Sequence, residues 1–225
     1  MNEVELAQMI DHTLLKPYAT EDDLRKILEE CKQYHFKMAA INSGVTAFCK
    51  AVLAGSGVHT GAAISFPLGT NTIEAKLYET EDAIRNGADE IDYVLNIARL
   101  KMGDTAYIED EMKQMTHLCH KHGILIKVIF ENCYLTKEEI RTAAEIAARV
   151  KPDFIKTSTG FGTGGATAED VALMKQTVGD AVQVKAAGGI RNLDDALKMI
   201  EAGATRLGTS HGVDIIEEFR KRQGK

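Results

Sequence analysis

Two lysines stand inside apolar runs of strand length, where a charged side chain is costly unless chemistry uses it. Lys156 lies in the segment DFIKTSTG at 153–160, and Lys185 lies in VQVKAAGG at 182–189. Burial disfavours the ammonium form and lowers the pKa of the amine, so Lys156 could present a neutral amine to a carbonyl carbon. If the two strands are neighbours, each cation lowers the pKa of the other further. A lone lysine of this kind could equally lie on an edge strand and point to water.

An acid is placed in the same way as these lysines. Asp92 lies in the apolar run EIDYVL at 90–95. If Asp92, Lys156 and Lys185 converge, the set can form a Schiff base, with Lys156 attacking and the other two moving protons. The alternative is a buried ion pair between Asp92 and Lys127, and such a pair is weak evidence of function. His12 could orient a substrate hydroxyl, although a core histidine with satisfied hydrogen bonds is the commoner case.

Glycines and hydroxyls follow three of these predicted strands and could cradle a phosphate. Gly188 and Gly189 come after Lys185, Gly208 and Ser210 end a later strand, and Gly160 follows Lys156. Glycine lets backbone N–H groups approach an anion, and the two later loops also open a helix N-terminus. Each loop alone is typical of an ordinary turn. Their recurrence on successive strands indicates a phosphate site, and the loop after Lys156 lacks the closing Gly-Lys-Ser/Thr of a Walker loop.

The elements that must position these residues alternate along the chain. Helix signals such as Thr20, Thr136 and Thr167, each followed by acidic residues, alternate with short apolar runs. Counting a short strand near Ile10, eight strands alternate with helices, and strands apolar throughout are typical of a parallel sheet covered on both faces. We therefore predict an α/β protein, a (β/α)8 TIM barrel with a short N-terminal helical extension, forming one domain over residues 1–225. An open doubly wound sheet is the alternative.

The barrel prediction gives the chemical residues a common location. Active sites of such barrels lie at the carboxyl ends of the strands, and phosphates often bind on the loops after the seventh and eighth strands. Those are the loops that contain Gly188, Gly189, Gly208 and Ser210.

Composition restricts the class of protein and its partners. Of 225 residues, 44% are hydrophobic and 27% charged, as in soluble globular proteins. The net charge of -6 argues against a nucleic acid or an anionic membrane as the main partner. Since no apolar run could span a bilayer and the N-terminus lacks the features of a signal peptide, we expect a cytoplasmic protein.

Neither the cysteines nor the histidines predict a disulfide or a metal site. The four cysteines are far apart and form no Cys-x-x-Cys pair. A denser group, His117, Cys119, His120 and His122, precedes Gly123, a predicted helix stop. Imidazoles in a last helical turn suit the negative end of the helix dipole, so we predict no metal here.

Several longer motifs resemble one enzyme family. They are IDHTLLKP at 10–17, FPLG at 66–69, EID at 90–92, FIKTSTGFG at 154–162, VKAAGGIR at 184–191 and RLGTS at 206–210, which together span nearly the whole chain. On these motifs the chain resembles the deoxyribose-phosphate aldolases, class I aldolases built as (β/α)8 barrels. The chain differs from the common family pattern at Ala40, Ser43, Ser65 and Asn132, and it ends without the tyrosine that some members fold towards the site.

The resemblance implies roles for the residues singled out above. Lys156 would be the Schiff-base lysine, Asp92 and Lys185 the proton-relay pair, and Gly160, Gly188, Gly189, Gly208 and Ser210 the phosphate site. The implied reaction is reversible cleavage of 2-deoxyribose 5-phosphate to acetaldehyde and glyceraldehyde 3-phosphate, with no metal or organic cofactor. The expected partners are phosphosugar and aldehyde substrates, and barrels of this kind often form homodimers or larger homo-oligomers.

Two other functions remain open from the sequence. One is a related phosphosugar lyase or isomerase on the same barrel, acting by proton transfer without a covalent intermediate. The other is a non-catalytic protein that binds a phosphometabolite, although such a protein gains nothing from two desolvated lysines and their carboxylate.

Overall fold

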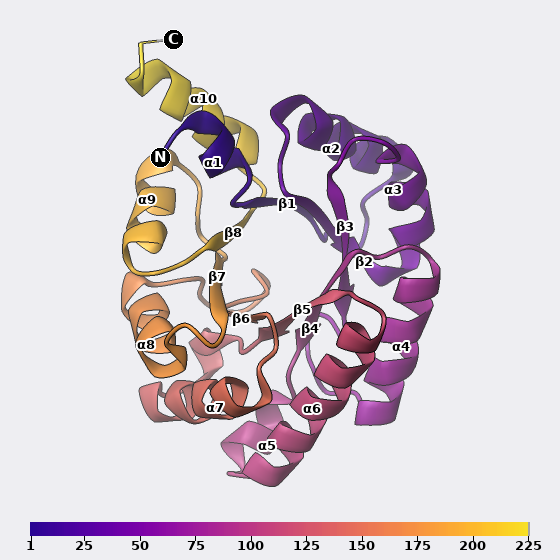
Figure 1. Cartoon of the computed structure of the whole chain (residues 1–225), viewed down its shortest axis with the longest axis vertical. Helices are drawn as coiled ribbons and strands as arrows, with labels where there is room; N and C mark the ends of the chain where they lie inside the picture. Colours follow the sequence, from indigo (N-terminus) through magenta and orange to yellow (C-terminus); the bar gives the residue numbers. More distant parts are fainter. Residues whose placement is uncertain (225) are drawn as a thin grey trace.

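Eight parallel strands close into a barrel in the order in which they occur along the chain (Figure 1). The structure is a computed structural model and describes residues 1–224, so the last residue of the predicted domain lies outside it. This arrangement confirms the predicted (β/α)8 barrel and rules out the open sheet. The strands are β1 Ile10–Leu14, β2 Met38–Asn42, β3 His59–Ile64, β4 Glu90–Val94, β5 Leu125–Ile129, β6 Phe154–Lys156, β7 Gln183–Ala187 and β8 Arg206–Thr209.

Helices surround the barrel and begin where the sequence supplies capping residues. Thr20 and Thr136 each form a reciprocal capping box with the acidic residue three positions later, which satisfies two backbone donors at the helix start. The α-helices are α1 Glu3–Ala7, α2 Glu21–Tyr34, α3 Thr46–Val52, α4 Ile73–Arg85, α5 Ile97–Lys101, α6 Thr105–Lys121, α7 Lys137–Val150, α8 Ala168–Val178, α9 Leu193–Glu201 and α10 Gly212–Arg222, with short 3-10 turns at Ser43–Val45 and Asn132–Tyr134.

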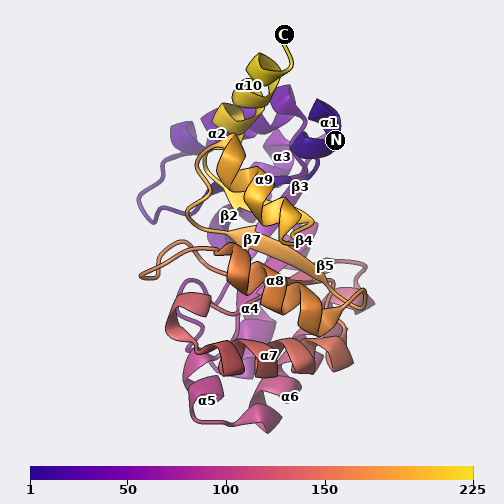
Figure 2. The same cartoon turned by 90° about the vertical axis from the view of Figure 1, so that its left-hand side faces the viewer.

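The two ends of the chain meet on one side of the barrel. Helix α1 lies beside α10 in both views (Figures 1 and 2), and the two helices contact each other. Arg220 of α10 donates to a carboxylate oxygen of Glu3 in α1 over 2.8 Å. The predicted N-terminal helical extension is therefore present and packs against the last helix.

The strands separate apolar from charged side chains by direction. Ile91 and Tyr93 of β4 belong to the hydrophobic core between barrel and helices, whereas Glu90 and Asp92 bind side chains from β5, β7 and β8 inside the barrel. Burying an isoleucine of this kind contributes about 1.5–3 kcal/mol. The stabilising apolar core therefore lies outside the barrel wall, between the strands and the helices. The sequence predicts strands buried on both faces, and they are, but the inner face is held largely by ion pairs.

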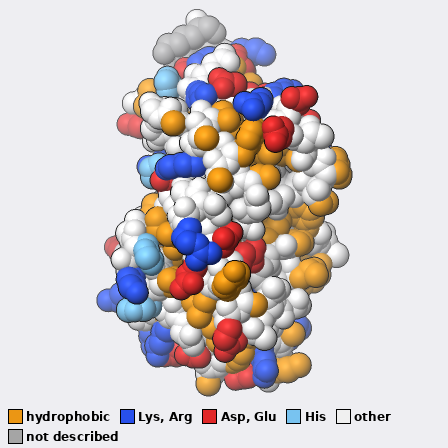
Figure 3. All heavy atoms as spheres, turned by 90° about the vertical axis from the view of Figure 1, so that its right-hand side faces the viewer, with side chains coloured by type: hydrophobic (Ala, Val, Ile, Leu, Met, Phe, Trp, Pro, Cys, Tyr) orange, Lys and Arg blue, Asp and Glu red, His pale blue; other side chains and the backbone are white. Residues whose placement is uncertain are grey.

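One face of the molecule carries both signs of charge. Figure 3 shows the face on the right of Figure 1, where acidic and basic side chains are interspersed with exposed apolar ones. Within residues 1–224, no helix is both long enough and apolar enough to cross a membrane.

Two local features differ from the sequence-based expectation. Helix α5 was not predicted, because its five residues begin only three positions after β4 and leave no room for a helical repeat. Ser65, which stands where the family more often has glycine, has a φ of 50°. The left-handed conformation disfavours side chains with a Cβ atom, which gives a physical reason for glycine at this position.

Gly69 provides a test of how tightly the loop after β3 is packed. Its φ is 69°, and an added Cβ would lie 2.2 Å from the carbonyl oxygen of Leu95. We expect Gly69→Ala to destabilise the protein by about 3 kcal/mol or more, measured by urea unfolding, because backbone strain and a backbone clash add.

Gly103→Ala is the matched control. Gly103 has a similar φ of 74° but no atom within 4 Å of the added Cβ, so only the strain of about 1 kcal/mol remains. Equal losses in the two variants would contradict the clash.

Candidate active site

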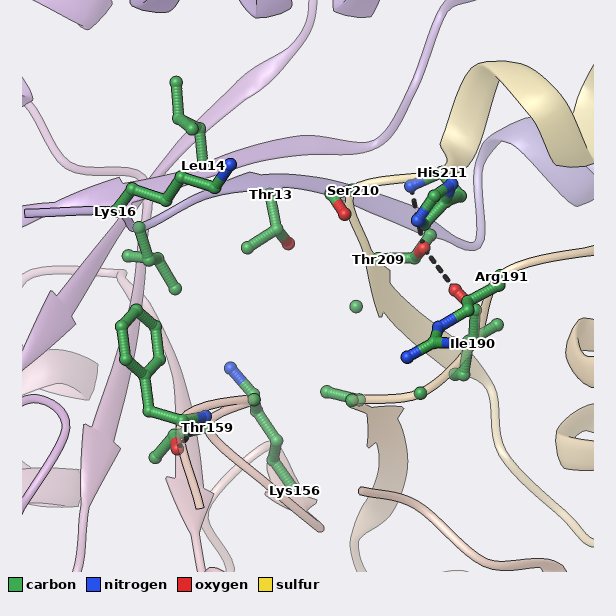
Figure 4. A pocket seen from close by; sticks show the side chains of 17 residues that line it. Thr13, Leu14, Lys16, Lys156, Thr159, Ile190, Arg191, Thr209, Ser210 and His211 are labelled. Atoms are coloured by element: carbon green, nitrogen blue, oxygen red, sulfur yellow. Dashed lines mark hydrogen bonds between the residues drawn. The ribbon is translucent and has the colours of Figure 1, made fainter. Parts of the chain in front are cut away.

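A cavity of about 520 Å³ opens at the carboxyl ends of β1, β6, β7 and β8 (Figure 4). It lies where barrels of this type carry their active sites. The lining residues come from these strand ends and the loops that follow: Thr13, Leu14, Leu15, Lys16, Lys156, Thr159, Gly160, Phe161, Ala187, Gly188, Gly189, Ile190, Arg191, Gly208, Thr209, Ser210 and His211. All five residues of the predicted phosphate site are among them, and so is Lys156.

Asp92 joins three lysines next to this cavity, which Lys156 lines while Asp92 and Lys185 lie behind its lining. One carboxylate oxygen, Oδ2, accepts from Lys156 over 2.8 Å and from Lys185 over 2.7 Å, and Oδ1 accepts from Lys127 over 2.7 Å. The register places Lys156 beside Lys185 and Asp92 beside Lys127 on neighbouring strands. The predicted set therefore converges, and the predicted ion pair with Lys127 forms as well. Neither lysine of the predicted set lies on an edge, because the barrel has none.

The shared carboxylate leaves the lysines in different electrostatic situations. Burial lowers the pKa of Lys156 to about 8, and the nearby Lys185 and Lys127 cations act in the same direction against the attraction of Asp92. Burial also works against a charged Lys127, but Asp92 and Glu90 together raise its pKa above the ordinary value. For Asp92, burial favours the neutral acid, yet the three lysines hold its pKa well below the usual range. Asp92 thus stays ionised, and Lys156 loses its proton more readily than an ordinary lysine.

Glycines shape the opposite end of the cavity. Gly160, Gly188 and Gly189 have φ values of 89°, 83° and 79°, a conformation in which backbone N–H groups can turn towards an anion without steric cost. Gly208 is different, since it lies within β8 and a Cβ there would come 3.2 Å from Cε of Lys185. Gly208 therefore leaves room for Lys185 in addition to lining the cavity.

One helix N-terminus at this end carries no side-chain cap. His211 precedes α10 and makes no capping hydrogen bond, so the first N–H groups of α10 and its dipole favour an anion beside Ser210. The start of α9 is instead occupied, because Asn192 caps it and Asp195 accepts from the Arg191 backbone. The sequence predicts two helix starts at the phosphate site. Of these two, only the start of α10 has backbone N–H groups without a capping side chain.

Two cationic side chains that were not among the predicted site residues also line the cavity. Figure 4 shows the Arg191 guanidinium directed into the cavity and Lys16 on the opposite wall. Both residues occur in the motifs quoted above, but a solvated face explains an exposed cation equally well, and only the fold places these two on either side of one cavity.

Glu131 braces the wall formed by the loop after β6. It is buried, has a φ of 57°, and accepts hydrogen bonds from the Thr159 hydroxyl and from the Thr159 backbone N–H at 3.1 Å. The Thr159 oxygen in turn accepts from the Phe161 backbone over 3.0 Å. Thr159, Gly160 and Phe161 are thus held in place by an acid that no sequence pattern singles out.

Other candidate residues lie outside the cavity. His12 binds Glu30 over 2.8 Å and packs on Phe36, so its ring lies outside the cavity lining. In the histidine-rich end of α6, His120 pairs with Asp153 and Cys119 is buried.

The positions that differ from the family pattern also lie outside the cavity. Ser43 donates to Glu79, Asn132 donates to the Met174 sulfur, and Ala40 is buried on β2. With Ser65, none of the four lines the cavity.

The pKa of Lys156 gives a direct prediction for amine reactivity. Only the neutral amine reacts, so the rate of trace acetylation of Lys156 by acetic anhydride should rise with pH. The rate should reach half of its maximum near pH 8 and level off above that pH. The measurement is peptide mass spectrometry against a free amine standard. The same peptide in unfolded protein is the control, and it should titrate near 10.4, as an ordinary lysine does. A midpoint shared by folded and unfolded protein would contradict the assigned environment.

Comparison with known proteins places this fold and cavity in a family. The model of the DeoC/LacD family aldolases matches residues 6–218. The deoxyribose-phosphate aldolase of Lactobacillus acidophilus is 58% identical over 97% of this chain and 92% of its own length. A solved structure of the tetrameric deoxyribose phosphate aldolase from Aeropyrum pernix superposes with a TM-score of 0.91 at 32% identity, covering 98% of this chain and 93% of that one. A putative deoxyribose-phosphate aldolase from Coccidioides immitis gives a TM-score of 0.93 at 34% identity, covering 98% and 87%. The chain belongs to the DeoC/LacD family of aldolases.

Proposed function

We propose that this aldolase cleaves 2-deoxyribose 5-phosphate reversibly to acetaldehyde and glyceraldehyde 3-phosphate through a Schiff base on Lys156. The observation that carries the proposal is the carboxylate of Asp92, which binds both Lys156 and Lys185 below an open cavity. The substrate is proposed from the relatives named deoxyribose-phosphate aldolase. The far end of the cavity suits the phosphate group of this substrate.

The first step is attack of the neutral Lys156 amine on the substrate aldehyde. A lysine with a pKa of about 8 is roughly 10% neutral at pH 7, against about 0.04% for an ordinary lysine. The lowered pKa therefore raises the reactive fraction by about two orders of magnitude. The carbinolamine then loses water to give the protonated imine, with Lys185 and Asp92 supplying and removing the protons.

The imine draws electrons from the bond that breaks. A base removes the proton of the C3 hydroxyl, the C2–C3 bond breaks, and its electron pair forms an enamine on Lys156 while glyceraldehyde 3-phosphate leaves. Protonation of the enamine at C2 and hydrolysis of the new imine release acetaldehyde and restore Lys156. Asp92, held ionised by its lysines, and Lys185 are the groups within reach for these transfers.

The phosphate end fixes the substrate relative to the amine. Backbone groups of Gly160, Gly188 and Gly189, the Ser210 hydroxyl and the uncapped start of α10 form one wall of the cavity. Arg191 adds a full positive charge at this wall, and an arginine binds a phosphate in a fixed, bidentate manner. The substrate then spans from Lys156 to α10, with its phosphate remote from the bond that breaks.

We also propose that the chain forms a homo-oligomer. The support is the tetramer named for the Aeropyrum pernix relative, which shares the fold over nearly the whole chain.

Lys156→Arg separates this mechanism from proton transfer without a covalent intermediate. Arginine keeps the charge but cannot form the imine, so acetaldehyde release from 2-deoxyribose 5-phosphate should fall by at least about 10³-fold. With borohydride and substrate, the wild-type protein should gain a permanent adduct on Lys156, located by peptide mass spectrometry.

Lys151→Arg, at an exposed helix end, is the control and should keep wild-type turnover. Retained turnover in Lys156→Arg would favour an isomerase or lyase that acts by proton transfer alone. Tight binding without product in the wild type would indicate a non-catalytic binding protein.

Arg191→Ala tests the phosphate end separately from the chemistry. Loss of one charge-assisted contact should raise KM for 2-deoxyribose 5-phosphate by about 10-fold or more, with little change in kcat and no change in any turnover of unphosphorylated 2-deoxyribose. Arg85→Ala, on α4 and paired with Asp82, is the matched control. An equal loss for both substrates would show that Arg191 does not act on the phosphate.

A further inference from the structure

A second layer of charged side chains lies below the residues assigned to the reaction. Glu90 and Arg206 are the first residues of β4 and β8, and Lys127 comes from β5. All three are buried inside the barrel, Glu90 and Arg206 at the amino-terminal ends of their strands and Lys127 in register with Asp92. We call them the floor charges. The proposed mechanism uses none of them directly.

Direct contacts join the floor charges to the reacting residues. Lys127 donates to Asp92 over 2.7 Å and lies 2.5 Å from the carboxylate of Glu90. Arg206 lies 3.3 Å from Glu90 and 2.7 Å from Asp11. Asp11 then pairs with Lys185, so the contacts close a ring from Asp92 through the floor and back to Asp92.

The ring contains no unmatched charge when Lys156 is neutral. Among residues 1–224, the buried anions of this network are Asp11, Glu90 and Asp92, and its cations besides Lys156 are Lys127, Lys185 and Arg206. His59, half-buried at the water-facing edge, pairs with Glu90 from outside the ring. Protonation of Lys156 therefore adds a fourth cation to three anions. An uncompensated charge in a low-dielectric interior is costly.

We propose that the floor charges are positioning residues: Lys127 occupies one oxygen of Asp92, Glu90 binds Lys127 and Arg206 binds Glu90, and together they keep the amine of Lys156 available for reaction. This inference rests on the proposed function of Lys156. Lys127 illustrates the effect, because it contacts two carboxylates, Asp92 and Glu90, and its pKa rises, whereas Lys156 contacts only the shared carboxylate of Asp92 and its pKa falls.

Every element around Lys156 contributes to this balance. Asp92 faces it from β4, Lys185 from β7 and Lys127 from β5. Lys16, Arg191 and His211 line the same cavity from loops, with Lys16 and Arg191 exposed, where solvent screens their charges. The floor charges are buried, so their effect on Lys156 is screened much less.

The alternative is that the ion pairs of the floor only fill the barrel. Buried ion pairs are common without any role in function, and removing one partner destabilises a protein whatever the pair does. Loss of stability or of activity therefore does not decide the matter. The titration midpoint of Lys156 does decide it. Ion pairs that only fill space give no reason for the midpoint to shift up when a cation is removed and down when an anion is removed.

The test uses three variants of the full-length protein, Lys127→Met, Glu90→Gln and the double variant. Removing the cation should raise the acetylation midpoint of Lys156 by about one to two pH units, and removing the anion should lower it by a similar amount. The double variant restores the charge balance and should return the midpoint to near 8. The rising limb of kcat/KM against pH should move with it.

The outcomes separate the two explanations. Opposite shifts that cancel in the double variant support the inference. Midpoints that stay near that of the wild type, or that move in the same direction in both single variants, overturn it. If Lys127→Met does not fold, Arg206→Gln removes a cation from the same layer and must also raise the midpoint, while Arg206→Lys keeps the charge and must leave it in place.

Acetylation of Lys156 needs no turnover, so this test stands apart from the proposed reaction. A wild-type protein that releases no acetaldehyde refutes the proposed reaction but leaves the titration readable. A protein that turns over with unmoved midpoints in both single variants refutes only the role of the floor charges.

Discussion

The site depends on one carboxylate that three lysines share. Asp92 has two oxygens, and Lys127 takes one while Lys156 and Lys185 divide the other. A pair of one lysine and one aspartate would hold both groups charged and leave the amine unreactive at neutral pH. Sharing the anion prevents this for Lys156, because its only carboxylate partner, Asp92, also binds Lys185 and Lys127. The low pKa of Lys156 follows from that shortage together with burial.

Three buried lysines around one carboxylate are tolerated only because the rest of the barrel stabilises the fold. The hydrophobic core lies between strands and helices, where Ile91 and Tyr93 pack, and this core supplies the stability that the charged interior does not. Small residues make space inside the barrel: Gly61 admits the Met38 side chain, and Gly208 admits Lys185. The barrel interior can therefore contain charges at fixed distances, which is what the chemistry of an amine nucleophile requires.

The sequence predicts the barrel and the three residues that we propose to react because both depend on local patterns. Apolar runs, helix caps and lysines within strands are visible without any knowledge of the fold. The ring through Glu90, Arg206 and Asp11 is not, since it forms between strands whose spacing in the sequence says nothing about which inner residues meet. Glu131 was missed for a similar reason, because its left-handed backbone and its bond to Thr159 are set by tertiary packing. The choice between the two roles of His12 also depends on the fold, which shows on which side of β1 the imidazole lies.

The two ends of the cavity differ in how they are held, and the difference suits their tasks. At the amine end, side chains are locked by strands and by charge pairing, so Lys156 and Asp92 cannot move apart without leaving charges unpaired in the interior. At the far end, backbone groups of glycines and the start of α10 line an open wall, with Arg191 the exposed cation. In the proposed reaction the phosphate carries its charge through every step, so backbone dipoles that stay in place can hold it throughout. In the proposed reaction the carbonyl end changes charge at each step and needs groups that gain and lose protons near neutral pH, and we propose that the buried ring of charges sets this balance.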